Sequence, residues 1–244
     1  MRKLAIALLS VAALTAGLAH AQGCPTSTSI HTLRLNPPAS GTTLVTPCNA
    51  VITAVRADGI YVSQEPHGAW DAIWVYWPGH TYTGSGGVAA PGDVVHICGV
   101  YKDVCGLDTI DIPAAGIYGY VLKIGTTVVP PVNYVTASAL MASPEQWESV
   151  LIMVTDGMTV PIGFDLGGGT WAVDALDGTD LVFGSFWYDF GSVMDSQCYN
   201  NATGILHDAC GSYVVEPFVD GIDVVSCSVG PEAISLGSLK ASFR

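Results

Sequence analysis

The chain has 244 residues, which is enough for two small domains, and 50% of them are hydrophobic. Its 21 acidic residues outnumber its 8 basic residues, and the formal net charge at pH 7 is −13. Most nucleic-acid-binding proteins carry a stripe of Lys and Arg that neutralises phosphates. The scattered basic residues of this chain form no such stripe, so the composition argues against direct phosphate contacts.

Residues 1–21 have the form of a secretory signal peptide. A positive start is followed by the apolar residues 4–18 and by an A-x-A cleavage site that ends at Ala21. The apolar run is short for a membrane-spanning helix, and the residues before Cys24 match a lipoprotein signal poorly. We therefore expect cleavage between Ala21 and Gln22, no membrane span, and a secreted, periplasmic or cell-surface location. Cleavage removes two basic residues and leaves a formal charge of 6 − 21 = −15.

Short strands and glycine-rich turns predict a first β-barrel at residues 48–127, after an irregular lead-in at 22–47 that is rich in Thr, Ser and Pro. The turn at Asp58-Gly59 is a hairpin signal. The predicted strands of this barrel lie at 50–56, 60–64, 72–77, 94–100 and 107–112. Short strands, frequent glycine and one long turning strand are typical of a small Greek-key barrel of the OB type.

A second barrel is predicted at residues 128–227. Pro130 and Pro131 mark its start, and residues 137–147 are the only convincing helical stretch. Further strands are predicted at 150–154, 170–173, 180–183 and 220–225. Residues 228–244 have the form of a tail.

A repeated phrase connects the two barrels. The sequence GVYKDVCG at residues 99–106 recurs as GILHDACG at residues 204–211, and an apolar strand follows each copy. A repeat of this kind predicts one β-unit used twice. The predicted fold class is therefore all-β, with two small OB-fold-like Greek-key barrels in tandem and a short helical connector.

Seven cysteines without a C-x-x-C pair predict disulfide bonds in a secreted chain. A tight hairpin at 99–104 would place Cys98 opposite Cys105, within bridging reach. Cys24 with Cys48 would tie the lead-in to the first barrel. Three others then compete within the second repeat, namely Cys198, Cys210 and Cys227. Because seven is odd, at least one cysteine is free or pairs between molecules.

No catalytic motif is present. The sequence lacks H-E-x-x-H, G-x-S-x-G, a P-loop and a dinucleotide-binding G-x-G-x-x-G, and its histidines never stand at metal-ligand spacing. We therefore expect a protein that is not an enzyme and has no cofactor. Asp174, Asp177 and Asp180 come closest to a calcium-binding loop, although a solvated turn is the stronger interpretation.

Several segments resemble the OB-fold-like accessory domains of large secreted bacterial nucleases of the endonuclease/exonuclease/phosphatase type. The resemblance is carried by GIYVSQ at 59–64, DAIWVY at 71–76, PGDVV at 91–95, ESVLIMV at 148–154 and GSYVVEP at 211–217. In that family the chemistry belongs to a separate metal-dependent domain, which we do not expect in this chain. The resemblance therefore implies an accessory module and no catalytic residues.

The best predicted site is aromatic. OB folds bind ligands on the face of their second and third strands. If Ile60 and Ile73 point into the barrel, alternation along each strand turns Tyr61, Trp74 and Tyr76 outward. This predicts a stacking platform for bases or sugar rings, with Trp70 and Trp77 near its edges. The alternative is that the lead-in or the second barrel covers the same rings.

The sequence thus predicts a secreted, non-catalytic tandem OB-fold module for binding or assembly. Its expected partner is an extracellular protein, a glycan or a second copy of the chain. The alternative is an accessory protein of an extracellular nuclease system that binds single-stranded DNA. In that case bound calcium would have to bridge the acidic surface and the phosphates, because the charge of the chain opposes such binding.

Overall fold

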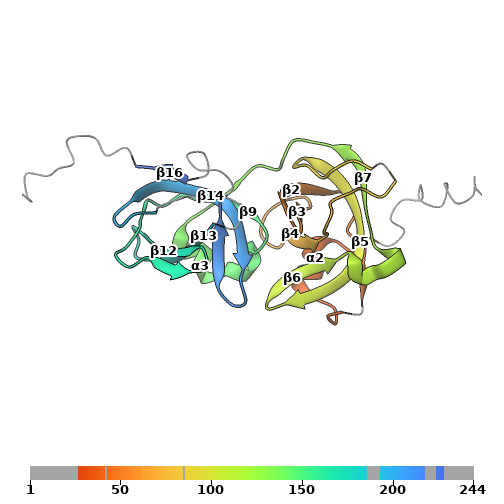
Figure 1. Cartoon of the computed structure of the whole chain (residues 1–244), viewed down its shortest axis with the longest axis horizontal. Helices are drawn as coiled ribbons and strands as arrows, with labels where there is room; N and C mark the ends of the chain where they lie inside the picture. Colours follow the sequence, from red (N-terminus) through yellow and green to blue (C-terminus); the bar gives the residue numbers. More distant parts are fainter. Residues whose placement is uncertain (1–26, 42, 85, 186–192, 218–223, 228–244) are drawn as a thin grey trace, which may run out of the picture. The chain divides into compact units, whose positions relative to one another are not determined.

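A computed structural model describes residues 27–41, 43–84, 86–185, 193–217 and 224–227 (Figure 1). The fold is all-β with short helices, and the chain divides into two compact units. The first unit covers the chain up to Pro66 and then Ile73–Asp103 and Asp108–Pro130. The second unit takes His67–Ala72, Val104–Leu107 and the chain from Pro131 onward. No helix of the described residues is long and apolar enough to span a membrane.

Five strands of the first unit close into a ring, which we call barrel 1. Their order is β5-β2-β3-β4-β6, and β6 pairs back with β5. β4 and β6 run parallel, whereas β2 is antiparallel to β3 and to β5. This closed Greek-key arrangement is that of an OB fold. The strands are β2 (Ala50–Arg56), β3 (Gly59–Ser63), β4 (Ala72–Tyr76), β5 (Asp93–Val104) and β6 (Leu107–Asp111), and β1 (Leu44–Val45) and β7 (Tyr120–Thr126) add to β5.

The second unit repeats this topology as barrel 2. Its ring runs β10-β12-β13-β15-β14 and closes by pairing of β10 with β14, and β13 and β15 again run parallel. The strands are β9 (Leu151–Val154), β10 (Met158–Thr159), β12 (Thr170–Ala175), β13 (Asp180–Gly184), β14 (Cys198–Asp208) and β15 (Tyr213–Glu216), with β8 (Asn133–Val135), β11 (Asp165–Gly167) and β16 (Val224–Ser226) beside them. The prediction of two OB-like barrels is confirmed.

The repeated phrase occupies the same place in both barrels. In each copy a long strand ends at a turn, and Cys105 (φ 57°) and Cys210 (φ 58°) begin that turn. Each cysteine is followed by a left-handed glycine, and two successive residues with positive φ make the turn that suits a β-hairpin. Gly99 and Gly204 also occupy equivalent positions, each close to the backbone of a neighbouring strand. A Cβ on Gly99 would lie 3.1 Å from the carbonyl oxygen of Asp111, and one on Gly204 would lie 2.6 Å from that of Glu216.

The interior of each barrel is filled by alternate side chains of its strands. In barrel 1 the core contains Ile60 and Val62 from β3 and Ile73 and Val75 from β4, as alternation predicts. In barrel 2 the corresponding strands contribute Trp171 and Val173 from β12 and Leu181 and Phe183 from β13.

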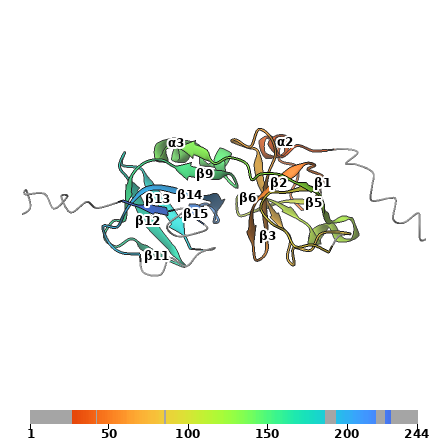
Figure 2. The same ribbon diagram turned by 90° about the horizontal axis from the view of Figure 1, so that it is seen from above.

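The lead-in is more ordered than its composition predicts. Residues Ile30–Leu35 form helix α2, and the Ser29 hydroxyl caps it by accepting a hydrogen bond from the Thr32 N–H at 3.1 Å. Ile30 and Leu33 are buried in the core of barrel 1, next to which α2 is drawn in Figure 2. The prediction of an irregular lead-in is therefore wrong at residues 30–35, because a spacing of three residues turns both apolar side chains to one face.

The predicted connector helix is present but interrupted. Helix α3 (Ala137–Ala142) is followed by the 3₁₀ helix η2 (Pro144–Trp147), since a residue before proline avoids the helical conformation. A second 3₁₀ segment that was not predicted, η1 (Pro113–Tyr118), follows β6. The predicted strand at 220–225 is described only from Val224, and the predicted signal peptide and tail lie outside the described residues.

The cysteine pairing differs from the prediction. β5 continues to Val104, so Cys105 lies in the turn, whereas Cys98 lies within the strand and pairs with Tyr120 of β7. Cys98 and Cys105 are free thiols, and the predicted bridge between them is wrong. Cys198 and Cys227 form a disulfide bond with their Cα atoms 5.5 Å apart. Cys48 is also disulfide-bonded, and its predicted partner Cys24 lies outside the described residues.

Candidate functional site

The predicted aromatic platform is closed. Tyr61 of β3 and Trp74 of β4 point away from the barrel core, as alternation predicts, since neither ring belongs to that core. Their ring centroids lie only 4.5 Å apart, and the exposed fractions of the two residues are 0% and 5%. A base or sugar ring has no open surface to stack on here. As an accessible platform, the prediction is wrong.

Barrel 1 itself supplies part of the cover over Trp74. The Arg56 guanidinium lies 5.2 Å from the centre of a Trp74 ring, which is cation–π contact. Asp58 holds Arg56 in place through an ion pair of 3.1 Å. On another side the backbone of Gly59 is so close that a Cβ there would lie 2.5 Å from the Trp74 indole. A ligand approaching from this side would have to displace Arg56.

The remaining predicted platform residues lie in different environments. Tyr76 is 37% exposed at the end of β4, whereas Trp77 is buried in the barrel core beside Tyr82, with ring centroids 5.5 Å apart. Trp70 belongs to the second unit, where its backbone N–H donates to the Gln146 carbonyl at 2.7 Å. The five predicted aromatic residues therefore do not make one surface.

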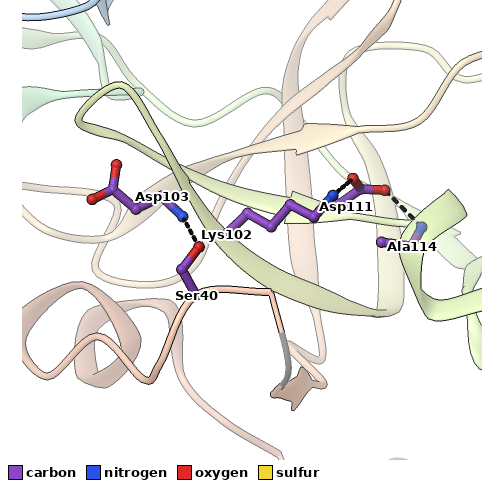
Figure 3. A network of polar contacts seen from close by, with 5 residues as sticks. All are labelled: Ser40, Lys102, Asp103, Asp111 and Ala114. Carbon is purple, nitrogen blue, oxygen red and sulfur yellow. Dashed lines mark hydrogen bonds and ion pairs between the residues drawn. The ribbon is translucent and has the colours of Figure 1, made fainter.

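The basic side chains of barrel 1 are all engaged in ion pairs. Among the residues that the structure describes, every Lys and Arg is paired with an aspartate: Arg34 with Asp108 at 3.4 Å, Arg56 with Asp58 at 3.1 Å, Lys102 with Asp111 at 2.6 Å, and Lys123 with Asp93 at 2.5 Å. Figure 3 shows the third pair, in which the Asp111 carboxylate also accepts from the Ala114 N–H at 2.8 Å. In the same view the Asp103 N–H donates to the Ser40 hydroxyl at 3.0 Å. A phosphate would have to compete with these carboxylates.

One of these pairs is part of a buried cluster. Asp93 is almost wholly buried, and it accepts a hydrogen bond from the Tyr82 hydroxyl at 2.5 Å and another from the Ala90 N–H at 3.2 Å. Burial alone would raise the pKa of Asp93, but the hydrogen bonds from Lys123, Tyr82 and Ala90 together lower the pKa below its ordinary value. The Asp93 carboxylate is therefore a fixed structural anion.

Barrel 2 presents a different surface on its second and third strands. The side chains that alternate with its core residues are small or acidic, and none is aromatic. We call this surface the acidic face, and it comprises Thr170, Ala172 and Asp174 of β12 with Asp180 and Val182 of β13. Each of these residues is partly or fully exposed.

Two carboxylates face each other across the acidic face. Asp174 lies directly opposite Asp180 in the register of β12 and β13, and Thr159 of β10 lies opposite Asp174 on its other side. Like charges at directly opposed positions of neighbouring strands repel and destabilise the pair. A cation bound above them would remove that repulsion.

The whole second repeat shares this charge. Residues 131–227 contain no Lys or Arg, and they contain 13 acidic residues, at positions 145, 148, 156, 165, 174, 177, 180, 189, 195, 208, 216, 220 and 223. Ion pairs with Lys or Arg of the same repeat are therefore impossible. The spacing of the basic residues along the sequence already contains this asymmetry, although their total number does not reveal it.

The three predicted calcium ligands do not come together as a site. The Asp177 carboxylate accepts from the Thr179 N–H at 2.9 Å, and its hydrogen bonds with Thr179 and then Ser138 lower the pKa of Asp177. It thus caps its own turn. Among the described residues, no three His, Cys, Asp or Glu side chains gather closely enough to hold a metal ion. The geometry gives the calcium prediction no support.

Comparison with known proteins adds little. No protein family matches the chain, and no curated protein does. One similar solved structure is that of the hypothetical protein ygiW from E. coli, with 17% sequence identity and a TM-score of 0.31. The match covers 42% of this chain and 100% of that chain.

Proposed function

We propose that the protein is a non-catalytic binding module that acts outside the cytoplasm, and that barrel 2 binds a positively charged partner protein. The acidic face is the expected contact surface. One observation carries the proposal: residues 131–227 combine 13 acidic residues with no Lys or Arg, and two of the carboxylates face each other on the strands where OB folds bind ligands.

The negative charge of barrel 2 acts on a partner at long range and at short range. A barrel with no basic residue of its own has a negative potential over a wide surface, and such a field speeds the encounter with a cationic partner. At short range, a Lys or Arg side chain placed between Asp174 and Asp180 would relieve their repulsion. The same surface repels nucleic acid.

The rival function, binding of single-stranded DNA, has less support. The rings of Tyr61 and Trp74 are buried against each other, and every described Lys and Arg already has an aspartate partner. Binding of single strands normally needs open aromatic rings and a positive groove. Calcium would have to supply all the positive charge.

Fluorescence anisotropy tests both functions with the chain from residue 22 to residue 244. A labelled oligo-lysine peptide and a labelled single-stranded oligonucleotide are titrated at low salt, in calcium and then in EDTA. The double variant Asp174→Asn/Asp180→Asn is compared with Asp165→Asn/Asp195→Asn, which removes the same charge at two exposed positions, one in β11 and one in the turn before β14.

We expect the peptide to bind and the oligonucleotide not to bind. The face variant should weaken peptide binding about tenfold, which corresponds to about 1.4 kcal/mol, because both facing charges are lost. The control variant should change it by less than about twofold, because exposed charges elsewhere act only through the screened field. Equal effects of the two variants would contradict a role for the acidic face. Saturable binding of the oligonucleotide would replace the proposal with the rival function.

A further inference from the structure

The two copies of the repeated phrase bring two thiols into the same compact unit. The turn Val104–Leu107 belongs to the second unit, together with the turn between β14 and β15. Cys105 and Cys210 occupy equal positions in these turns, and both are exposed free thiols. Exposed thiols in an oxidising environment are normally consumed by disulfide formation.

Contacts on either side of the thiols hold the two turns together. Gly106 lies so close to the Asp208 carboxylate that a Cβ there would collide with Oδ2. The other oxygen of Asp208 accepts from the Gly211 N–H at 2.5 Å. Asp208 therefore contacts both turns at once, immediately beside the two cysteines.

The thiols themselves are neighbours that interact. Cys105 and Cys210 are joined by a side-chain hydrogen bond, and this bond is the main reason that the pKa of the Cys210 thiol is raised. Burial and the negative charges of Cys105 and Asp208 act in the same direction. Thiols on two neighbouring turns that interact in this way are placed to close the gap to the bond length of about 2.05 Å in a disulfide.

We propose that Cys105 and Cys210 form a disulfide bond that joins the two repeated turns when the chain is in an oxidising environment. This assignment also accounts for the odd number of cysteines. Cys198 is bonded to Cys227, and Cys48 is bonded as well. With Cys105 and Cys210 paired, the free thiol left over is Cys98, which is buried in β5 and beyond the reach of another molecule.

The reaction requires an oxidant, and a low-molecular-weight disulfide such as oxidised glutathione supplies it. One cysteine loses its proton, and its thiolate attacks the small disulfide, whose S–S bond breaks and releases one thiol. The second cysteine, also as a thiolate, then attacks the mixed disulfide and releases the second small thiol. The two cysteines lose two electrons and two protons in total, and one small disulfide is reduced to two thiols.

The test counts thiols in the purified chain from residue 22 to residue 244 after equilibration with oxidised glutathione. The protein is unfolded without reductant, alkylated and weighed, and its pepsin peptides are mapped at acid pH to prevent disulfide exchange. Three bridges leave 7 − 6 = 1 free thiol. We expect one alkylated cysteine, Cys98, and a linked peptide pair that contains Cys105 and Cys210.

Two variants sharpen the result. Cys105→Ser should leave two alkylated cysteines, Cys98 and Cys210, whereas the control Cys98→Ser should leave none. Three free thiols in the wild-type chain, a bridge from Cys105 or Cys210 to any other cysteine, or a disulfide-linked dimer would overturn the proposal. The wild-type map decides the matter even if a variant folds poorly. Because the oxidant is added in the test tube, the outcome is independent of partner binding and of location.

Discussion

In both units, tyrosine hydroxyls donate hydrogen bonds to carboxylates. Tyr82 donates to Asp93 at 2.5 Å, Tyr213 donates to Glu145 at 2.8 Å, and Tyr101 donates to Asp108. Burial is the main cause that raises the pKa of each of these tyrosines, and the hydrogen bond to the carboxylate adds to it. Ionisation of any of these hydroxyls in the folded protein would place two negative charges together.

The chain should therefore lose stability at alkaline pH. A tyrosine whose pKa is raised by folding contributes stability that is complete below the ordinary value of 10.0 and is lost as the pH rises towards the folded value. We expect the urea midpoint to fall above about pH 10. Tyr101→Phe should reduce this fall, whereas Tyr76→Phe, at an exposed ring, should leave it unchanged. A midpoint that is flat up to pH 12 would contradict the prediction.

The ion pair of Arg34 and Asp108 gives a second prediction for single residues. Both residues are buried, and Asp108 also accepts the Tyr101 hydroxyl bond, so Asp108→Asn removes a buried charge from the ion pair and from this hydrogen bond at once. We expect Asp108→Asn to lower the free energy of unfolding by about 3–5 kcal/mol.

The matched control is Asp58→Asn, which breaks the Arg56 pair at a side chain that is 44% exposed. That change should cost about 0–1 kcal/mol, because water already solvates the exposed carboxylate. Urea unfolding of both variants at pH 7 provides the comparison. A cost for Asp108→Asn no larger than for the control would show that the buried pair stabilises little.

At the level of secondary-structure elements, Gly99 and Gly204 allow the long strands β5 and β14 to pack closely on their neighbours. The Cβ of an alanine at position 204 would lie 2.6 Å from the carbonyl oxygen of Glu216, which is backbone and cannot rotate away. An alanine at position 99 would contact the buried side chain of Ile110. Each strand pair would have to separate to admit the methyl group.

We expect Gly204→Ala and Gly99→Ala each to lower the free energy of unfolding by about 1–3 kcal/mol. Gly125→Ala is the matched control, because Gly125 also lies in a strand but has no atom within 4 Å of its Cβ position. That change should be neutral or slightly stabilising. Urea denaturation of the three variants measures the difference, and equal effects would contradict the steric explanation.

Local patterns in the sequence predict the strands and the direction of their side chains, but they do not predict which residues cover those side chains. Alternation placed Ile60 and Ile73 inside barrel 1 and Tyr61 and Trp74 outside its core, because the two-residue period of a strand is a local property. Whether an outward ring is exposed depends on residues such as Arg56 and Gly59 that cover it. No pattern within the strand contains that information.

The wrong Cys98–Cys105 bridge and the unpredicted helix α2 also depend on information that local sequence patterns do not contain. The bridge from Cys98 to Cys105 was predicted from a hairpin that begins too early, since nothing in the local composition indicates that β5 continues to Val104. Helix α2 is one and a half turns long, and its Thr-rich surroundings conceal the pair Ile30 and Leu33. Its stability comes from burial in the barrel core, which is a tertiary effect.

At the level of the whole molecule, the two barrels share a topology and differ in charge. Barrel 1 contains Lys and Arg side chains paired with aspartates, whereas residues 131–227 contain neither residue type. Repulsion among the acidic groups of barrel 2 therefore lacks compensation from its own chain. Dissolved salt screens such repulsion, with a Debye length of about 30 Å at 0.01 M and about 8 Å at 0.15 M.

Barrel 2 should accordingly gain stability when salt is raised from 0.01 M to 0.15 M, and barrel 1 should change little. Hydrogen exchange resolves the two, because amides of β14 report on barrel 2 and amides of β5 report on barrel 1. We expect amide exchange from β14 to slow by about threefold or more. A tenfold change in exchange rate corresponds to about 1.4 kcal/mol of stability, and screening should recover part of such an energy. A response of equal size in β5 would show that the effect is not specific to barrel 2.

The absence of Lys and Arg has a further consequence for the fate of the chain. Trypsin-like proteases cut after these two residues, and between Lys123 and Lys240 they find no bond to cleave. Even the fully unfolded chain would yield this stretch as one fragment of 240 − 123 = 117 residues. Barrel 2 would thus resist this class of protease through its composition, without relying on the stability of its fold.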